Sequence, residues 1–275
     1  MGALLALASA VCYGISDFAG GLLSRRAPFA TVALTGQAGG LVLSVTVASF
    51  APAPAIRPAD LAWGALSGAG TGLGMLFLFR GLSRGAMSVV VPVSAVGGVT
   101  LPVLAGVALL GERPPALSWL GIGAAVPALW LVSRARTSTG PAATATLDGL
   151  IAGTGIALQY LALAQAGPDS GIWPVAAGRV TAILTILPLS IATPVSRLPR
   201  STTLRAAVIG AVASLALICY LLATQRQLAV VAVVLSSLYP AVPVLLGILV
   251  LRERLSWPQT LGVVAAAASV VLLTV

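Results

Sequence analysis

Long apolar runs, separated by short polar stretches, follow one another along the whole chain. A membrane-spanning helix needs about 20 apolar residues. Segments of roughly that length lie at residues 2–23, 29–50, 60–81, 87–110, 116–133, 147–166, 171–193, 203–223, 228–250 and 257–275. The longest polar stretch, residues 133–146, separates the fifth segment from the sixth. The pattern predicts an all-α integral membrane protein with ten transmembrane helices, five on each side of this linker.

One stretch of the first half is repeated in the second. Residues 89–121 align without a gap with residues 230–262, at a constant offset of 141 positions. The alignment matches Pro102 with Pro243, Gly106 with Gly247, Glu112 with Glu253 and Arg113 with Arg254. Proline, glycine and a Glu-Arg pair are informative matches in so apolar a chain, so we infer an internal repeat with domains 1–137 and 138–275.

The odd number of helices in each half has a topological consequence. If both halves have the same fold, the second must enter the membrane from the side opposite to the first. The two five-helix repeats are then inverted, and a pseudo-two-fold axis in the membrane plane relates them. Transporters that work by alternating access often use this design, with the substrate site near the midplane between the repeats.

Composition agrees with the apolar pattern and adds an orientation. Only 8% of residues are charged, against about 25% in a soluble domain, so the lipid bilayer is the expected environment. All 15 basic residues are arginine, and the net charge is +9. A basic chain can bind nucleic acid, but arginine in the loops of a membrane protein sets orientation instead, and we expect no nucleic-acid partner.

The arginines are unevenly divided between the two sides of the predicted membrane. Eleven fall on one side, and Arg57, Arg113 and Arg226 fall on the other. The arginine-rich side should be cytoplasmic. We therefore expect a multi-pass protein of the plasma membrane with both termini on the extracytoplasmic side.

Two charged residues, Asp17 and Arg179, fall inside predicted spans. A charge at the centre of a span costs about 2.5–3.5 kcal/mol on insertion scales, and it usually faces a cavity or a partner. Asp17 is either a substrate or proton site, or a structural carboxylate that caps a loop or pairs with Arg25 or Arg26. Arg179 either binds an anionic group with its forked donors or hydrogen-bonds freed carbonyls. We expect no direct bridge between the two, because their depths differ by ~10 Å at about 1.5 Å per residue.

Further polar, aromatic and proline residues could line a cavity. Gln37 lies within one position of the place that corresponds to Arg179 in the first half. Lining candidates that could equally be packing or interfacial residues are Tyr13, Trp63, Gln159, Tyr160, Trp173 and Tyr239. Prolines inside spans remove backbone hydrogen bonds and kink helices, either around a cavity or as static bends, and the candidates are Pro92, Pro102, Pro240 and Pro243.

Other motifs predict structure rather than chemistry. Small residues four positions apart let helices approach closely, as at Gly36 and Gly40, Gly64 and Gly68, Gly70 and Gly74, and Gly149 and Gly153. The run GAGTGLG at residues 68–74 lacks the spacing and preceding strand of a nucleotide-binding loop. Glu112 and Glu253 end the repeated segments, where a paired structural role at the helix end is expected. The chain has no histidine, metal-binding motif or nucleotide loop, so we expect no metal, no cofactor and no enzyme activity.

The repeated segment, which reads SSLYPAVPVLLGILVLRERLSWPQTLG in the second half, resembles the EamA repeat of the drug/metabolite transporter superfamily. The opening YGISDFAGGLLSRR is similar to bacterial members of this group. The resemblance implies ten helices in two inverted repeats, with a central cavity formed by the first four helices of each. Arg179 matches an arginine common in the second helix of such repeats, whereas the first half has Gln37 there. Members often keep both termini inside, and the arginine distribution here predicts the reverse.

The resemblance also implies secondary transport of small metabolites, often amino acid export. We expect a monomeric exporter of a small polar metabolite such as an amino acid, driven by a proton or another ion gradient, with Asp17 as the proton or cation site. Two alternatives stay open. One is efflux of cationic or amphipathic drugs, with Asp17 as the counter-charge. The other is a non-transporting membrane scaffold or lipid-processing enzyme.

Overall fold

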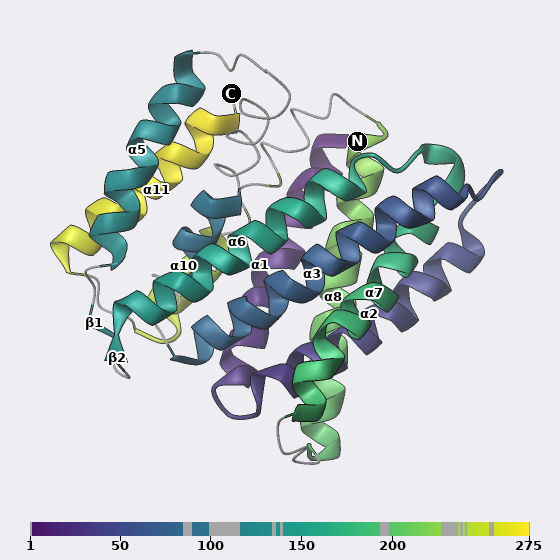
Figure 1. Ribbon diagram of the computed structural model, residues 1–275, viewed down its shortest axis with the longest axis horizontal. Coiled ribbons are helices and arrows are strands. Elements are labelled where there is room, and N and C mark those ends of the chain that lie inside the picture. The colour runs from purple at the N-terminus through teal and green to yellow at the C-terminus, as the bar shows by residue number, and fades with distance from the viewer. Residues whose placement is uncertain are drawn as a thin grey trace.

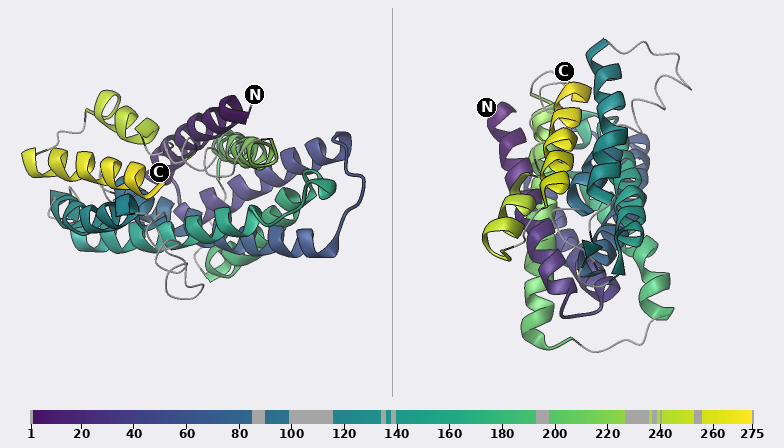
Figure 2. Two further views of the ribbon diagram at one scale, coloured as in Figure 1. Left: turned by 90° about the horizontal axis from the view of Figure 1, so that it is seen from above. Right: turned by 90° about the vertical axis from the view of Figure 1, so that its left-hand side faces the viewer.

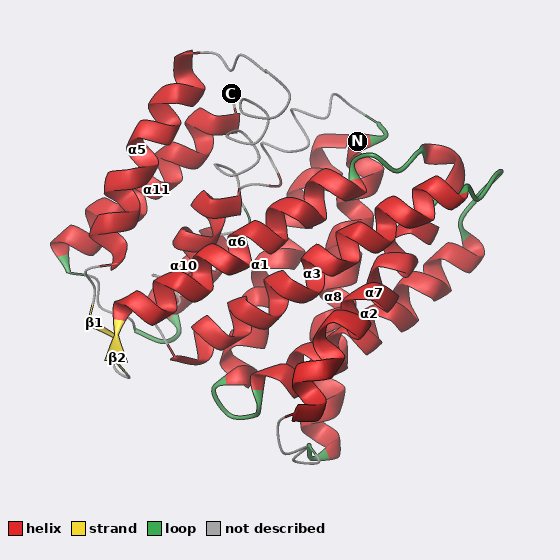
Figure 3. Cartoon of the chain, viewed as in Figure 1, coloured by secondary structure: helices red, strands yellow, loops and turns green. Residues whose placement is uncertain are grey.

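The described part of the protein is a bundle of long helices (Figures 1 and 3). The computed structural model describes residues 2–84, 90–98, 116–133, 136–137, 140–192, 198–226, 236, 239, 241–252 and 256–274. The helices are α1 (Gly2–Ser24), α2 (Phe29–Phe50), α3 (Pro58–Arg84), α5 (Ala116–Ser133), α6 (Ala142–Leu163), α7 (Trp173–Ala192), α8 (Arg200–Thr224), α10 (Ala241–Leu249) and α11 (Trp257–Thr274). Residues 90–98 are also helical, and Pro168–Ser170 form a single 3-10 turn.

The helix bounds follow the apolar runs closely, because each run must supply a helix long enough to cross the bilayer. The helices expected at 29–50 and 116–133 have those limits. Helix α6 begins at Ala142, five residues before the expected 147. The stretch AATAT is too polar to read as a span, but alanine favours helix and Pro141 suits the position just before the first turn.

Two very short strands lie in the predicted linker between the halves. Strand β1 (Arg136–Thr137) pairs in antiparallel register with β2 (Gly140–Pro141) just before α6. Within the described part of the chain, six helices are long and apolar enough to cross a membrane: α1, α2, α3, α7, α8 and residues 144–163 of α6. The structure thus supports a multi-pass helical membrane protein, with six of the ten expected crossings meeting this criterion.

The most extensive helix contacts join one half of the chain to the other. Helix α3 packs on α6 and α7, α8 packs on α1 and α2, and α5 packs on α11. If α1, α2, α3 and α5 correspond to α6, α7, α8 and α11, these contacts map onto one another in pairs. Helices α5 and α11 form a separate pair at one edge of the bundle (Figures 1 and 2). A two-fold relation between the halves would produce this pattern.

Glycine allows the close approach of the paired helices. A Cβ atom on Gly210 of α8 would collide with the carbonyl oxygen of Gly36 in α2, and one on Gly68 of α3 would collide with the carbonyl oxygen of Gly178 in α7. All four predicted glycine pairs lie against a neighbouring helix. Because lipid is as apolar as leucine, such backbone contact is a main source of helix association in membranes.

Polar contacts tie α3 to α6 at one end and to the loop that follows α6 at the other. At one end, Arg80 donates from Nε to Oδ1 of the buried Asp148 at 2.9 Å, and its guanidinium lies 4.2 Å from the centre of the Phe77 ring. At the other end, the Asp60 carboxylate accepts hydrogen bonds from the Gly167 backbone N–H at 2.9 Å and the Ser170 hydroxyl at 2.6 Å. The bundle is therefore closed by polar contacts above and below its apolar core.

The two ends of the bundle differ in charge. Arg25 donates to the Leu82 carbonyl oxygen near the Arg80 and Asp148 pair, and Arg26 and Arg205 line one hollow between α1 and α8. The opposite end holds Arg57, which is paired with Asp169 at 2.6 Å. Helix α1 begins and α11 ends on the same side of the bundle (Figure 2). These positions agree with the uneven arginine distribution expected from the sequence.

Candidate functional site

A small cavity lies among α1, α3, α6 and Tyr239, and we call it the Asp17 chamber. Its volume is about 20 Å³, enough for one water-sized group, since a single water needs about 10–15 Å³ on this measure. One set of lining residues is polar or aromatic: Tyr13, Asp17, Thr71, Gln159, Tyr160 and Tyr239. The other set is apolar: Gly74, Met75, Leu78 and Ile156. Both halves of the chain contribute, so the chamber lies at their interface.

Asp17 is the charged side chain of the chamber. It lies four residues after Tyr13 on α1, so the two side chains share one face of the helix. Its exposed fraction is 2%, and no described residue makes a hydrogen bond or an ion pair with its carboxylate. The neighbouring Ser16 instead ties α1 to α8 by donating to the Ile209 carbonyl oxygen at 3.1 Å. Burial of an unpaired carboxylate is costly, which makes Asp17 a functional candidate.

A chain of hydrogen bonds holds the polar wall in place. The Thr71 hydroxyl donates to Gln159 Oε1 at 2.7 Å, and Gln159 Nε2 donates to the Tyr13 hydroxyl at 2.9 Å. The Ser67 hydroxyl anchors the same turn of α6 by donating to the Gln159 carbonyl oxygen at 2.8 Å. These contacts fix the Tyr13 ring beside Asp17. Because the network is buried and internally satisfied, it should be rigid.

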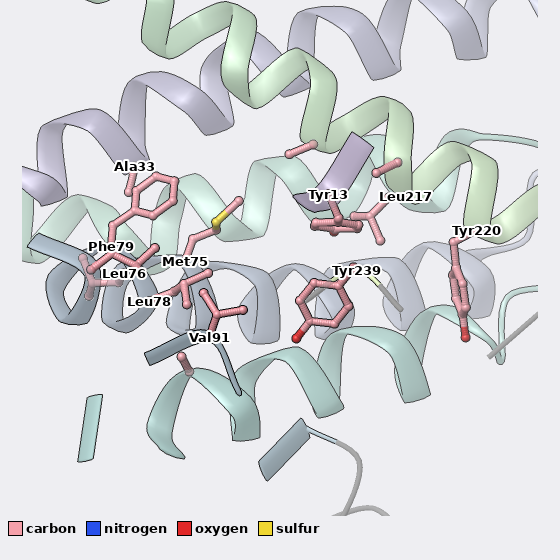
Figure 4. Close-up of a cluster of buried hydrophobic side chains, with 14 of the residues drawn as sticks. Tyr13, Ala33, Met75, Leu76, Leu78, Phe79, Val91, Leu217, Tyr220 and Tyr239 are labelled. Atoms are coloured by element: carbon pink, nitrogen blue, oxygen red, sulfur yellow. The ribbon is translucent and has the colours of Figure 1, made fainter. Parts of the chain in front are cut away.

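Tyrosine rings surround the carboxylate. The Tyr13 ring centre lies 6.1 Å from that of Tyr160 and 6.2 Å from that of Tyr239, in tilted or edge-to-face arrangements. Tyr220 of α8 stands behind Tyr160, with ring centres 4.7 Å apart. Figure 4 shows Tyr13 and Tyr239 next to each other, with Met75 and Leu78 beyond them. The Tyr239 hydroxyl is buried and has no hydrogen-bond partner among the described residues.

Arg179 lies outside the lining of the chamber. Its Nη1 donates to Gln37 Oε1 at 2.8 Å and its Nη2 donates to the Ala213 carbonyl oxygen at 3.2 Å. The side chain is 1% exposed, between α2, α7 and α8. Arg179 thus hydrogen-bonds one backbone carbonyl and the Gln37 side chain, whereas its Nε is buried without a hydrogen-bond partner among the described residues. Gln37, which the sequence placed at the corresponding position, is its partner.

The remaining predicted residues have different environments. Trp63 is 41% exposed and Trp173 is half-buried, and neither lines the chamber. Pro92 is buried within the helical residues 90–98, and Pro243 is buried in the first turn of α10. Pro102, Pro240, Glu112 and Glu253 lie outside the described residues. Among the described residues, no group of three or more His, Cys, Asp or Glu side chains could hold a metal ion.

Thr71 lines the chamber but was not predicted from the sequence. Thr71 lies inside GAGTGLG, where the glycines at 70 and 74 pack on α6 as expected. The threonine between them faces the same helix and reaches Gln159. The sequence signal that could have identified Thr71 is its polar side chain within a glycine-rich run that packs against another helix. Asp60 and Asp148 were also missed, because each lies near the end of a helix, where a carboxylate is unremarkable in a sequence.

The chain matches known proteins over its whole length. A family model described as the EamA-like transporter family matches residues 1–134 and 142–275. One solved structure, described only as the crystal structure of a protein, is 16% identical and has a TM-score of 0.61 over 98% of this chain and 95% of that chain. At that identity the likeness shows the fold alone. A search of curated proteins finds no match.

Proposed function

Because the chain belongs to the EamA-like transporter family of the drug/metabolite transporter superfamily, we propose that it is a secondary-active transporter of a small polar metabolite, such as an amino acid. It works as a monomer in the plasma membrane, where ten helices cross the bilayer in two inverted repeats. Both termini lie on the extracytoplasmic side of the membrane. The opposite end of the bundle is rich in arginine and therefore faces the cytoplasm. The symmetric pairing of helices between the halves supports the inverted arrangement.

The observation that carries the proposal is the position of Asp17. The Asp17 carboxylate, which makes no hydrogen bond or ion pair with a described residue, is buried in a small chamber that both halves of the chain build. Inverted-repeat transporters bind their substrate at such an interface and expose it to each side in turn. Asp17 is the site at which a proton or another cation couples to this change. The ionisable groups that share its chamber are Tyr13, Tyr160 and Tyr239.

Polar contacts of α3, with α6 at one end and with the loop after α6 at the other, supply the gates of this mechanism. The Arg80 and Asp148 pair closes the arginine-rich end, and the contacts of Asp60 with Gly167 and Ser170 close the other. With both sets formed, the chamber is shut on both sides. Separation of one set while the other holds opens the chamber to one side only, which is the requirement for alternating access.

Flux through reconstituted protein tests the proposal. Proteoliposomes are loaded with a labelled panel of amino acids and other small metabolites, with and without a pH gradient. We expect gradient-stimulated flux of at least one compound in the wild type and loss of the stimulation in Asp17→Asn. The matched control is Asp169→Asn, which changes an exposed carboxylate far from the chamber and should transport normally. Stimulation that persists in Asp17→Asn would remove Asp17 from the coupling step.

One observation favours the second candidate, efflux of cationic or amphipathic compounds. The charged side chain of the chamber is an acid, and its neighbours in the lining are aromatic, amide, hydroxyl or apolar groups. The same flux assay, run with organic cations, distinguishes this function from metabolite export. A membrane scaffold or a lipid-processing enzyme would give no flux of any compound from folded protein.

A further inference from the structure

A hollow between α1 and α8 combines two arginines with an apolar wall, and we call it the α1–α8 groove. Its polar lining residues are Arg26, Thr202 and Arg205, and its apolar wall includes Phe18, Leu22, Leu204 and Val208. We propose that the groove binds an anionic phospholipid of the surrounding bilayer, with the lipid phosphate between the two arginines. The inference goes beyond the proposed function, because such binding requires a membrane protein but no transport.

The charge of the groove is the first argument. Arg26 comes from the first half of the chain and Arg205 from the second, and no acidic side chain lines the groove with them. Both residues are exposed, and neither guanidinium makes a hydrogen bond or an ion pair with a described residue. Two such charges in one hollow attract an anion. Arginine suits a phosphate in particular, because its forked N–H donors match two phosphate oxygens.

The acidic side chains of the described part of the chain are all engaged or placed elsewhere. Asp148 and Asp169 are each paired with another arginine. Asp60 accepts hydrogen bonds from the loop after α6, and Asp17 lines the chamber. Among the described residues, the two arginines of the groove are thus left for a negatively charged ligand.

The directions of the two helices separate the polar end of the groove from its apolar end. Helix α1 ends just before Arg26, and α8 begins just before Thr202. Both arginines therefore lie at the arginine-rich end of the bundle, where the membrane surface is expected. Phe18 lies ~12 Å from Arg26 along the chain, at about 1.5 Å per residue. The apolar wall consequently runs from the arginines towards the middle of the membrane, as the acyl chain of a phospholipid does.

Size and exposure complete the match. The groove has a volume of about 560 Å³, within the range of about 300–1,000 Å³ that is usual for ligand sites. Leu204 is 66% exposed and Val208 is 53% exposed, so the wall is open to the bilayer. Basic pockets between membrane helices at the cytoplasmic side bind anionic lipid headgroups. A phospholipid would use both the arginines and the wall, whereas a free phosphate would use the arginines alone.

A bound lipid would contact both halves of the chain, because α1 belongs to the first and α8 to the second. The two helices already touch, and the Ser16 hydroxyl of α1 donates to the Ile209 carbonyl oxygen of α8 at 3.1 Å. A ligand that binds the folded protein and not the unfolded chain raises the melting temperature. Binding at the groove should therefore stabilise the protein, which gives a readout that does not depend on transport.

Thermal unfolding of the purified full-length protein in a non-ionic detergent tests the proposal. The probes are dioctanoyl phosphatidylglycerol, which is anionic, dioctanoyl phosphatidylcholine, which is zwitterionic, and inorganic phosphate, which has no acyl chain. The concentration that gives half of the maximal shift in melting temperature is an apparent Kd. Each arginine near an anionic lipid strengthens binding about fivefold. We therefore expect a Kd about 25-fold lower for phosphatidylglycerol than for phosphatidylcholine, and no shift with phosphate at the same concentrations.

Substitution of the two arginines assigns the binding to the groove. Arg26→Gln and Arg205→Gln should each raise the Kd of phosphatidylglycerol about fivefold, and the double variant should bind both lipids about equally. Arg226→Gln is the matched control, because it removes an exposed arginine beyond the other end of α8, and it should keep the wild-type Kd. Without added lipid these variants should melt like the wild type, since exposed side chains without partners contribute little to stability.

Four results would overturn the proposal. They are equal Kd values for the two lipids in the wild type, a melting temperature that neither lipid changes, a shift with phosphate as large as that with phosphatidylglycerol, and unchanged lipid binding in the double variant. None of them bears on the transport function. Selective binding of phosphatidylglycerol by a protein that gives no flux in proteoliposomes would support the lipid site and contradict transport.

Discussion

Arg179 Nη1 donates a hydrogen bond of 2.8 Å to Gln37 Oε1, and these two residues occupy corresponding places in the two halves of the chain. They are 142 positions apart, one more than the repeat offset of 141. Corresponding residues of two-fold-related halves can touch only close to the axis that relates them. If the two halves are related by the two-fold axis that we propose, the Arg179 and Gln37 pair marks the place where α2 and α7 meet on it.

Arg179 is expected to hold helices together rather than bind substrate. Arg179→Ala would strand the Gln37 and Ala213 acceptors and leave a void, at a cost of about 2–4 kcal/mol. Arg179→Met keeps most of the volume and should cost less, about 1–2 kcal/mol. Thermal unfolding of the purified protein measures both. Arg205→Ala, at an exposed position, is the control. Loss of flux in a fully stable Arg179→Met variant would contradict this role.

Gly210 is expected to be the most sensitive glycine of the α2 and α8 contact. A Cβ atom there meets the backbone of Gly36, which cannot move aside as a flexible side chain could. Gly210→Ala should therefore force the helices apart and cost about 1–3 kcal/mol or more. Gly123→Ala in α5 is the matched control, because nothing lies within 4 Å of its added carbon. Equal melting temperatures for the two variants would show that this close approach is unimportant.

The Asp60 contacts should stabilise the end of the bundle opposite the arginines. Both carboxylate oxygens of Asp60 accept hydrogen bonds, from the Gly167 N–H and the Ser170 hydroxyl. In Asp60→Asn the side-chain NH₂ would face one of these two donors, and that hydrogen bond would be lost. Asp60→Asn should cost about 1–3 kcal/mol. Asp169→Asn, which removes a carboxylate that is 44% exposed, should cost about 0–1 kcal/mol. A melting temperature for Asp60→Asn no lower than that of Asp169→Asn would contradict a stabilising role for the Asp60 contacts.

The charge distribution predicts the orientation in the membrane. A fluorescent reporter that matures only in the cytoplasm should stay dark when fused after Val275. The same reporter inserted between β1 and β2, after residue 138, should fluoresce, because that turn lies on the arginine-rich side of the sequence assignment. Fluorescence at Val275 would reverse the orientation and place both termini inside.

Much of the helical framework could be read from the sequence. The apolar runs predicted α1, α2 and α5 to within a residue, because the thickness of the bilayer imposes a length that a local stretch must satisfy alone. Glycine spacing correctly predicted close helix contacts, since a missing side chain is visible in the sequence and serves packing wherever the partner lies. Asp17 was identified as a candidate because a carboxylate inside an apolar run is costly.

The side that each polar residue faces was decided only by the tertiary structure. Lipid and protein interior are equally apolar, so a membrane helix lacks the hydrophobic stripe that would reveal its inner face. Arg179 and Asp17 consequently looked alike in the sequence, as single charges within spans. Packing of α7 against α2 and α8 gave Arg179 two protein acceptors. Packing of α1 beside α3 and α6 placed Asp17 in a chamber with tyrosine, amide, hydroxyl and apolar side chains, and no described residue pairs with its carboxylate. Contacts between residues far apart in the chain bring these partners together.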